Sequence, residues 1–553
     1  MDDNSKTNQA NYFAISLDDI IRDTTDEYLD SLDIDNPPEP KMIRFELLQT
    51  IRNNVELYNV SITKSKKIPC PRQLTESQIA HIILRLYPIV NIDFSGNADE
   101  ESEDKDFDAT VLAIYDKDTG LYSTSTKTFY KLIEQYRYNL RDYDFKEIMA
   151  IMSKKAPVRG RCSDPNLSIV NNGIFDYKTK QLMTFSPDYI FTSKTSVNYN
   201  PNATNVVIHN PDDGTDWDVE SWMDSISDNP EIVNLLWEVI GATVRPNYPW
   251  DKVIFLCSEI GCNAKGTFLQ LLKMLSGKGN YCSLSITDFN KDFLLEPLLS
   301  VSTVLSDESD TAGYLDDAST FKSIVTGDSI IINRKFKTPI TFASRLFMVF
   351  CLNGIMHVRD TSDSLYRRLL PVPMNKRFLG IERKYIKHDY LKRPEVLEYV
   401  LYKALNSNCY ELSMPQECKD LLQEFKVDNN PVQSFAEYFF GQNVFQWDLL
   451  PSSFLYALFK AWYEKNYPSG KLKSSHVFYR ELIKIVNDGD YDFVCENKDK
   501  QYRPGNMMDN PEWLIEEYNL QDWKNPLYKG ADKAKICTPS LKVHYRGLIR
   551  KGA

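Results

Sequence analysis

The feature that most constrains this chain is an apolar run that leads through a loop into a lysine and then into a helix. Residues 252–257 read Lys-Val-Ile-Phe-Leu-Cys, a composition typical of a buried strand. Lys265 and Thr267 follow a short loop, and residues 268–275 repeat apolar side chains at helical spacing. This is the layout of a phosphate-binding loop, in which backbone N–H groups and the helix N-terminus hold phosphate oxygens. The lysine of such a loop reaches the terminal phosphates, so the sequence predicts a nucleotide site here.

The loop departs from the usual motif at three positions. The pattern G-x-x-x-x-G-K-[ST] requires Gly where Glu259 and Ala264 stand, and Ser or Thr where Gly266 stands. Taken alone, the stretch also fits an ordinary glycine-containing turn between a strand and a helix. The residues expected to bind nucleotide are Gly261, Asn263, Ala264, Lys265, Gly266 and Thr267.

Two later strands end in side chains that suit phosphate chemistry. Residues 301–305 form an apolar run that leads to Asp307 and Glu308, and residues 346–352 lead to Asn353. The first acid can hold hydrated Mg²⁺ and the second can polarise an attacking water, while the amide orients that water or senses the terminal phosphate. An acid pair after a strand is common by chance, so the argument rests on the order of these parts along the chain.

Basic residues follow in two further places. Two short strands flank Arg334, Lys335, Phe336 and Lys337, a tip whose cations suit nucleic-acid phosphates and whose ring can stack on a base. The alternative is a solvated hairpin with incidental lysines. The pair Arg367-Arg368 can stabilise charge on a transferred phosphate across a subunit boundary, or can form a surface ion pair.

This order of parts resembles the superfamily III helicases, in particular the poxvirus-type and phage or plasmid replicative branch that also occurs in chromosomal islands. The sequence segments 321–328 and 360–368 carry the resemblance most strongly, and residues 171–176 resemble the segment that precedes the ATPase in that branch. The resemblance covers residues 165–380 well and the C-terminal region loosely. It implies an AAA+ core, hexameric rings with ATP and Mg²⁺ between subunits, and 3′→5′ translocation on single-stranded and forked DNA.

The resemblance also implies a role for each matching position. Lys265 would bind the phosphates, with the hydroxyl of Thr267 nearby. Asp307 would be the acid linked to the metal, Glu308 the catalytic base and Asn353 the sensor. Arg367 or Arg368 would be the arginine finger that acts on a neighbouring subunit, and Lys335 and Lys337 would contact DNA in the pore.

The departures in the loop weaken one part of this expectation. With Gly266 after the lysine, the usual Mg²⁺ hydroxyl is missing unless Thr267 substitutes, and Ala264 adds a methyl group where the backbone approaches phosphate most closely. Binding of ATP is therefore better supported than fast hydrolysis. The alternative function is a DNA-binding replication initiator or regulator that binds nucleotide but hydrolyses it poorly; a remodeller that does not act on DNA is disfavoured by the basic hairpin.

Composition and charge exclude other classes. The chain has 553 residues, of which 42% are hydrophobic and 26% charged, as in an ordinary soluble protein, and it has no apolar run long enough to span a membrane. Because the N-terminal residues are acidic, we expect no secretory signal. The scattered cysteines suggest reduced thiols, so we expect a cytoplasmic protein. The net charge of −12 is concentrated in residues 1–40 (−9) and 93–108 (−7), which leaves the remainder at +4 and compatible with DNA binding.

We therefore expect an α/β AAA+ ATPase core with an α+β N-terminal region and a C-terminal winged-helix-like domain. The expected winged helix rests on helices at 454–462 and 478–486, followed by strand-like pieces at 491–495, 542–545 and 548–549. It would also allow the chain to recognise duplex origin DNA. The expected segments are an acidic tail (1–40), an N-terminal α+β domain (41–215), a small helical collar (216–245), the helicase core (246–395), a helical connector (396–430) and the winged-helix-like DNA-binding domain (431–553).

Overall fold

The computed structural model describes residues 16–34, 36–60, 62–96, 109–258, 261, 263–309, 314–315, 317–343, 346–354, 357–358, 362–380, 383–466 and 472–552. The chain divides into two compact units. The first consists of Met1–Asp310, Ala318–Asn353 and Met374–Met414. The second consists of Thr311–Asp317, Gly354–Pro373 and Pro415–Ala553.

The first unit begins with helices around a small mixed sheet. Its strands have the order β3-β2-β1-β4, in which β1 pairs antiparallel with β2 and parallel with β4. Apolar side chains at helical spacing bury one face of each helix, so that helices and sheet share one core. The elements are α1 (Leu17–Asp30), α2 (Pro40–Val60), α3 (Glu76–Leu86), β1 (Ile89–Asp93), β2 (Val111–Asp116), β3 (Leu121–Ser123), α4 (Thr126–Tyr136), α5 (Asp142–Lys155) and β4 (Val158–Gly160).

The acidic N-terminal segment corrects our expectation of a tail, because residues 17–30 form the packed helix α1. Ser16 and Asp19 form a capping box at its start. Ile21 and Leu29 are 7% and 5% exposed, and they join the same core as the apolar face of α2. The acids of α1 lie on the other faces of the helix. Because acids are so numerous here, the amphipathic helical pattern is hard to recognise from composition. Residues 1–15 of the expected tail lie outside the described residues.

A set of short hairpins and two helices leads to the main sheet. Val170 pairs with Gly173 and leaves Asn171-Asn172 as a two-residue connection, the length of a tight β-hairpin turn. Two helices, α6 and α7, lie in the segment 216–245, and Asn229-Pro230 separates them. The elements are β5 (Leu167–Val170), β6 (Gly173–Asp176), β7 (Gln181–Met183), β8 (Ile208–His209), β9 (Asp216–Trp217), α6 (Val219–Ile226) and α7 (Pro230–Val244).

A parallel sheet forms the centre of the first unit and confirms the mixed α/β fold. Its strands in this unit have the order β11-β12-β16-β10. All neighbouring pairs are parallel, with Val253 opposite Met348 and Thr303 opposite Phe347. Both β10 and β16 are buried along their whole length, as expected of strands covered on two faces. The strands are β10 (Val253–Cys257), β11 (Tyr281–Cys282), β12 (Thr303–Ser309) and β16 (Phe347–Leu352).

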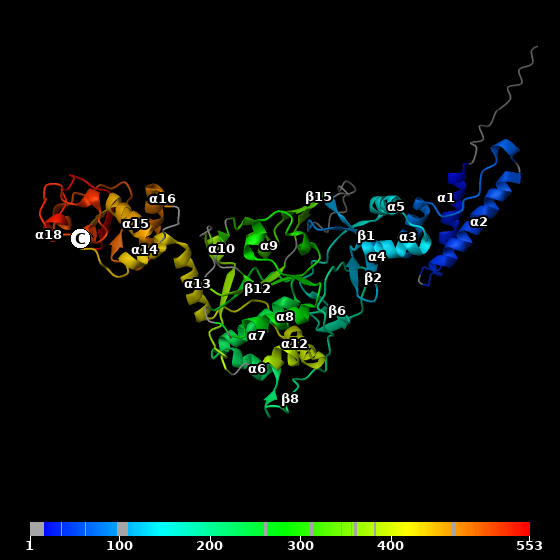
Figure 1. The fold of residues 1–553 in the computed structure, drawn as a ribbon, viewed down its shortest axis with the longest axis horizontal. Helices are drawn as coiled ribbons and strands as arrows, with labels where there is room; N and C mark the ends of the chain where they lie inside the picture. The colour runs from blue at the N-terminus through cyan, green and yellow to red at the C-terminus, as the bar shows by residue number, and fades with distance from the viewer. Residues whose placement is uncertain are drawn as a thin grey trace, which may run out of the picture. The chain divides into compact units, whose positions relative to one another are not determined.

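Helices cover this sheet and position its edge. α8 (Lys265–Ser276) packs on β12 and β16, and α7 and α12 (Pro394–Asn406) pack with it, as Figure 1 shows. α9 (Ser319–Thr326) places Phe321 6.3 Å from Phe350 of β16, measured between ring centroids. A short helix, α11 (Lys384–His388), precedes α12. The predicted basic hairpin is present as β14 (Ile330–Arg334) and β15 (Lys337–Phe342), which pair antiparallel.

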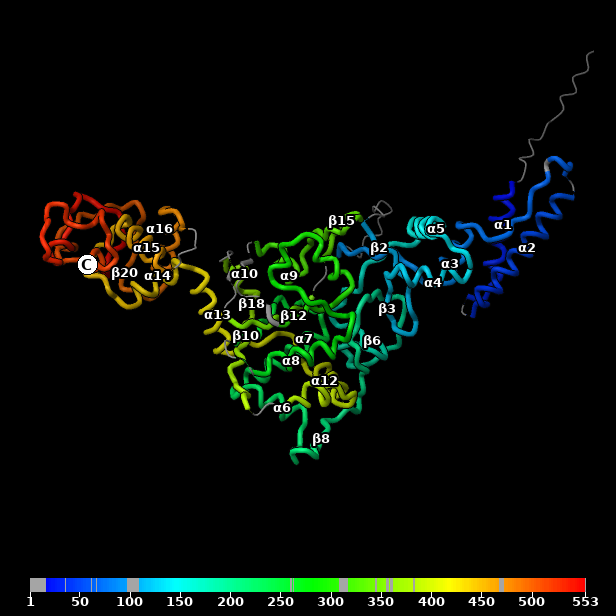
Figure 2. Tube along the Cα trace, viewed as in Figure 1, coloured from blue at the N-terminus to red at the C-terminus, as the bar shows by residue number. Residues whose placement is uncertain are grey.

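The second unit contains a helical core closed by a three-stranded sheet. Figures 1 and 2 show α14, α15 and α16 together, and their aromatic side chains fill the core, with the rings of Phe459 and Phe478 stacked 4.3 Å apart. The sheet has the order β19-β21-β20 and is antiparallel. The elements are β13 (Tyr314–Leu315), β17 (His357–Val358), α10 (Asp363–Tyr366), β18 (Leu369–Pro373), α13 (Gln416–Asn429), α14 (Pro431–Phe439), β19 (Leu449–Pro451), α15 (Ser452–Asn466), α16 (Ser475–Asp488), β20 (Phe493–Val494), α17 (Leu514–Glu517), α18 (Lys533–Ile536) and β21 (Gly547–Arg550).

One expected strand of this unit is wrong. Residues 542–545 form a loop in which only Tyr545 pairs, in an isolated bridge with Tyr502, and the strand β21 begins at Gly547. The expected connector at 396–430 contains α12, which belongs to the first unit, and α13, which belongs to the second. None of the helices within the described ranges combines the length and the apolar character that a bilayer crossing requires.

Candidate nucleotide site and basic hairpin

The turn between β10 and α8 is built around an alanine in a conformation that favours glycine. Ala264 has φ 65° and ψ −5° and is the N-cap residue of α8, with no side chain to cap the helix. The buried Asn263 accepts the N–H of Lys265 at 3.4 Å through Oδ1. Phe268 and the other expected apolar residues of α8 are fully buried, which anchors the helix. The N-terminus of a 12-residue helix therefore faces the loop, where its dipole favours an anion.

The ammonium group of Lys265 lies at the carboxyl edge of the sheet and contacts protein acceptors. Its Nζ donates to the backbone oxygen of Ser258 at 3.0 Å and to that of Leu352 at 2.6 Å. It also donates to Oδ1 of Asn353 at 2.9 Å. Lys265 is only 6% exposed. The lysine and the asparagine that the sequence placed in one site are therefore in direct contact, because β10 and β16 are neighbours and end at the same edge.

The acid pair lies at the carboxyl end of β12, which continues one residue further, to Ser309. Asp307 is exposed, and its Oδ2 lies 3.9 Å from the position that a Cβ on Gly266 would occupy. Burial and the neighbouring Asp307 raise the pKa of the Cys351 thiol to about 12, so that the thiol stays protonated beside the carboxylate. The backbone of Glu308 belongs to β12, but its side chain lies outside the described residues.

These residues fit a metal that is held mainly by water and phosphate. Mg²⁺ in phosphate-transfer sites commonly takes one or two carboxylates and keeps several waters. Asp307 provides one carboxylate beside the N-terminus of α8, whereas Gly266 provides no hydroxyl and Thr267 is half-buried one residue further along. In the described part of the chain, no group of three or more His, Cys, Asp or Glu side chains is arranged to hold a metal by itself.

The paired arginines differ in their surroundings within the second unit. Arg367 is exposed. Arg368 is 9% exposed, and its guanidinium donates to the backbone oxygen and to Oγ of Ser364, at 3.2 Å to the hydroxyl. Arg368 therefore closes the turn of α10, and Arg367 is the arginine of the pair that faces outward.

The four hairpin residues that we expect to contact DNA fall into two groups in the structure. Phe336 is 95% exposed and has φ 60°, and Nζ of Lys335 lies 5.3 Å from its ring centroid. Arg334 instead donates to the backbone oxygen of Thr338 at 2.9 and 2.7 Å, so it braces the turn. Lys337 lies 3.8 Å from Glu296 in an exposed ion pair, an arrangement of little net strength. Lys335 and Phe336 thus form the outward tip.

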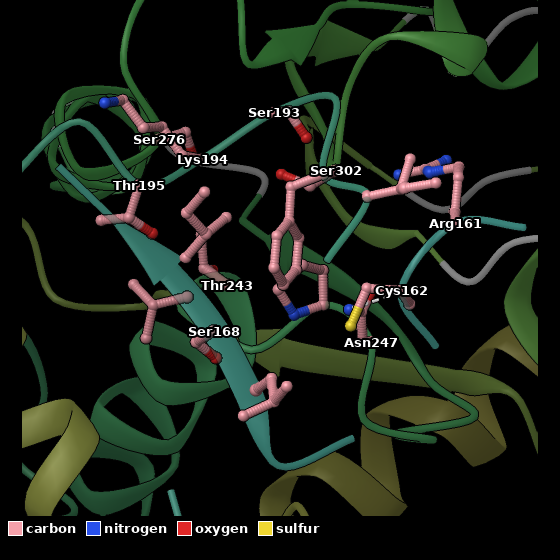
Figure 3. Close-up of a pocket in the computed structure, with 16 residues that line it drawn as sticks. Arg161, Cys162, Ser168, Ser193, Lys194, Thr195, Thr243, Asn247, Ser276 and Ser302 are labelled. Atoms are coloured by element: carbon pink, nitrogen blue, oxygen red, sulfur yellow. Dashed lines mark hydrogen bonds between the residues drawn. The ribbon is translucent and has the colours of Figure 1, made fainter. Parts of the chain in front are cut away.

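Two cavities of the first unit differ in size and in the residues that line them. One of about 450 Å³ lies beside the hairpin and is lined by Arg334, Lys337, Phe293 and others. The other, of about 30 Å³, is shown in Figure 3, where the side chains of Arg161 and Ser168 lie around a polar space. The second volume is far below the roughly 300 Å³ that a small-molecule ligand needs, so it is not a nucleotide site.

Sequence reasoning missed Lys387 of α11. Its Nζ lies 3.6 Å from the position that a Cβ on Gly266 would occupy. No motif signalled it, because it follows the phosphate loop by more than a hundred residues and reaches the loop only through the tertiary fold.

Three family matches cover successive parts of the chain. Residues 107–233 match a family described as D5 N terminal like, and residues 427–524 match Poxvirus D5 protein-like. Residues 256–368, which hold the phosphate loop, match a family of unknown function (DUF5906). No curated protein matches the chain.

Solved structures of the NrS-1 C-terminal region, in apo forms, are similar over much of the chain. One covers 86% of this chain and 100% of its own, with 12% identity and a TM-score of 0.43. Another covers 75% of this chain and 90% of its own, with 11% identity and a TM-score of 0.40. At these values the similarity carries no argument about function.

Proposed function

Because this chain belongs to the D5-like superfamily III helicases, we propose that it is an ATP-dependent replicative DNA helicase of a phage, plasmid or mobile genetic island. It forms hexameric rings and unwinds DNA in the 3′→5′ direction. Its substrates are single-stranded and forked DNA, and its C-terminal domain recognises duplex DNA at an origin.

One observation carries this proposal. The ammonium group of Lys265, the amide of Asn353 and the carboxylate of Asp307 converge where β10, β12 and β16 meet the N-terminus of α8. Such an edge of a parallel sheet is where α/β proteins bind nucleotides. In the proposal, Lys265 and the first turn of α8 hold the phosphates, Asp307 holds Mg²⁺, and Glu308 activates the attacking water.

The exposed Arg367 is the proposed finger that acts on the nucleotide of a neighbouring subunit, since Arg368 is engaged with Ser364. A mixing experiment tests this assignment. Increasing amounts of an Arg367→Ala variant, added to wild type at constant total protein, should inhibit ATP turnover more than in proportion to its share. Strictly proportional loss would contradict a finger supplied between subunits.

The hairpin tip is the proposed contact with single-stranded DNA. The exposed ring of Phe336 is available for stacking on a base, and Lys335 brings a cation beside it. Replacing Lys335 by Ala should weaken single-strand binding and reduce its salt slope by about 0.7. Lys278→Ala, an exposed lysine after α8, is the matched control. Equal behaviour of the two variants would refute the contact.

The C-terminal domain supports the proposed winged helix by its connectivity. The elements run α14, β19, α15, α16, β20 and β21, and β21 lies between the other two strands. This is the order of a winged helix in which a long insertion replaces the wing. In this reading α16 is the DNA-facing helix, and its exposed His476, Arg480 and Lys484 recur every four residues on one face.

DNA-stimulated ATPase activity is the deciding experiment, with molar mass measured by light scattering with and without nucleotide. Lys265→Ala should abolish turnover and unwinding, whereas Lys278→Ala should not. A Lys265→Ala variant that hydrolyses ATP and unwinds forked DNA like wild type would defeat the site.

The second candidate is an initiator or regulator that binds nucleotide but hydrolyses it poorly. Ala264 in the left-handed region and the missing hydroxyl at Gly266 favour it, because both weaken the arrangement of phosphate and metal. Turnover that stays near zero with single-stranded DNA would support the initiator, and stimulation by DNA would support the helicase.

A further inference from the structure

The space beside Gly266 is shared by two opposite charges. Gly266 is the second residue of α8, in the position where a phosphate loop normally carries Ser or Thr. A Cβ built there would lie 3.6 Å from Nζ of Lys387 and 3.9 Å from Oδ2 of Asp307, with no closer neighbour. An ammonium group therefore stands beside the position from which the metal-binding hydroxyl is missing.

Lys387 is held there by the anchoring of its helix. On α11, the hydroxyl of Tyr385 donates to Oδ2 of Asp213 at 2.6 Å, and its ring lies 4.9 Å from that of Tyr390, between centroids. Hydrogen bonds from Thr215 and Tyr385 lower the pKa of Asp213 to about 2, so this anchor persists at neutral pH. Lys387 itself is half-buried. All these residues belong to the first unit.

The charges around this point favour an anion. Lys265, Lys387 and the positive end of the α8 dipole lie near this point, and Asp307 supplies the opposing carboxylate. A polyphosphate chain that enters the site would be neutralised by two ammonium groups of this chain before any metal is bound. A loop of the usual sequence offers one lysine and a hydroxyl for the metal.

We propose that Lys387 contacts the terminal phosphates of the bound nucleotide and takes over part of the charge neutralisation that Mg²⁺ supplies elsewhere. This inference rests on the proposed nucleotide site. Its consequence is that the chain binds nucleoside triphosphate appreciably without a divalent metal, and that the absent side chain of Gly266 makes room for the ammonium group.

The test is the affinity of a fluorescent ATP analogue for the full chain, in Mg²⁺ and in excess EDTA at matched ionic strength. Lys387→Ala is compared with Lys384→Ala, an exposed lysine of the same helix, and with Lys387→Arg, which keeps the charge. A charge-assisted hydrogen bond is worth about 1.5–3 kcal/mol, or roughly 10- to 150-fold in affinity. Lys387→Ala should lose about that factor in EDTA and clearly less in Mg²⁺, while the other two variants stay near wild type.

Several results would overturn the inference. They are a wild type that does not bind in EDTA, a Lys387→Ala variant that matches Lys384→Ala in EDTA, and an equal loss in both buffers. Lys265→Ala separates this from the proposed function, because it should lose binding in both buffers. If Lys265→Ala binds like wild type in both, the nucleotide site itself is wrong. Circular dichroism of each variant checks that α11 substitutions leave the fold intact.

Discussion

Replacing Ala264 by Gly should stabilise the start of α8, although the same substitution destabilises most helices. Ala264 has φ 65°, in the left-handed region, where a Cβ costs about 1–2 kcal/mol relative to glycine. Glycine also increases the freedom of the unfolded chain, which costs about 0.4–1 kcal/mol. The difference raises the free energy needed to open this turn by about 0.5–1 kcal/mol.

The matched control is Ala150→Gly. Ala150 is exposed in the interior of α5, where glycine costs about 1 kcal/mol relative to alanine. Hydrogen exchange measured by mass spectrometry reports the local opening of each helix without requiring the whole chain to unfold in one step. Exchange in the first turns of α8 should slow by roughly two- to fivefold in Ala264→Gly, and exchange in α5 should accelerate by roughly fivefold in Ala150→Gly.

The result that refutes this reasoning is an acceleration of α8 exchange in Ala264→Gly comparable to that of α5 in the control. It would mean that the turn does not hold Ala264 in the left-handed region. Nucleotide binding gives a second measurement on the Ala264→Gly variant. Removing the methyl group from the backbone that faces phosphate should also tighten binding of a fluorescent ATP analogue.

Three further predictions follow from the site and the second unit. Gly266→Ser should tighten nucleotide binding in Mg²⁺ but not in EDTA, because the nearest atom is 3.6 Å from the new Cβ and the hydroxyl can reach the metal; equal change in both buffers would contradict this. Burial raises the pKa of Glu512 to about 7, so the folded second unit keeps a proton that the unfolded chain loses above about pH 4.5. The free energy of unfolding of this unit should therefore fall by about 2.5 kcal/mol as pH rises from 5 to 8, and calorimetry should find this slope reduced in Glu512→Gln. Arg480→Ala and Lys484→Ala should each lower the salt slope of duplex DNA binding by about 1, whereas Lys460→Ala on the exposed side of α15 should leave it unchanged; three equal slopes would exclude α16 as the DNA-facing helix.

The sequence predicted those parts of the fold whose pattern is local. The β10–α8 junction is recognisable because a buried run precedes a lysine and an amphipathic helix. The loop at 542–545 was mistaken for a strand because its residues favour strands, whereas pairing is a tertiary property and only Tyr545 has a partner in a bridge. Helix α1 was missed because its acids outnumber its apolar residues.

The candidate site could be predicted only where its residues follow strand ends. Asn353 is predicted at the end of a buried strand, and in the structure it accepts a hydrogen bond from Lys265 at 2.9 Å because the neighbouring parallel strands end at one edge. The left-handed conformation of Ala264 could not be read from an alanine, which normally avoids it. Lys387 reaches Gly266 only because α11 folds back against the loop, and no spacing along the chain encodes that approach.

The three acceptors around the Lys265 ammonium group mean that this cation must change partners when it binds phosphate. Its Nζ donates to the backbone oxygens of Ser258 and Leu352 and to Oδ1 of Asn353. In the proposed nucleotide site, a triphosphate competes with these oxygens for the same cation, so phosphate binding and release of Asn353 are coupled. Through this one side chain, phosphate binding would be communicated to the end of β16.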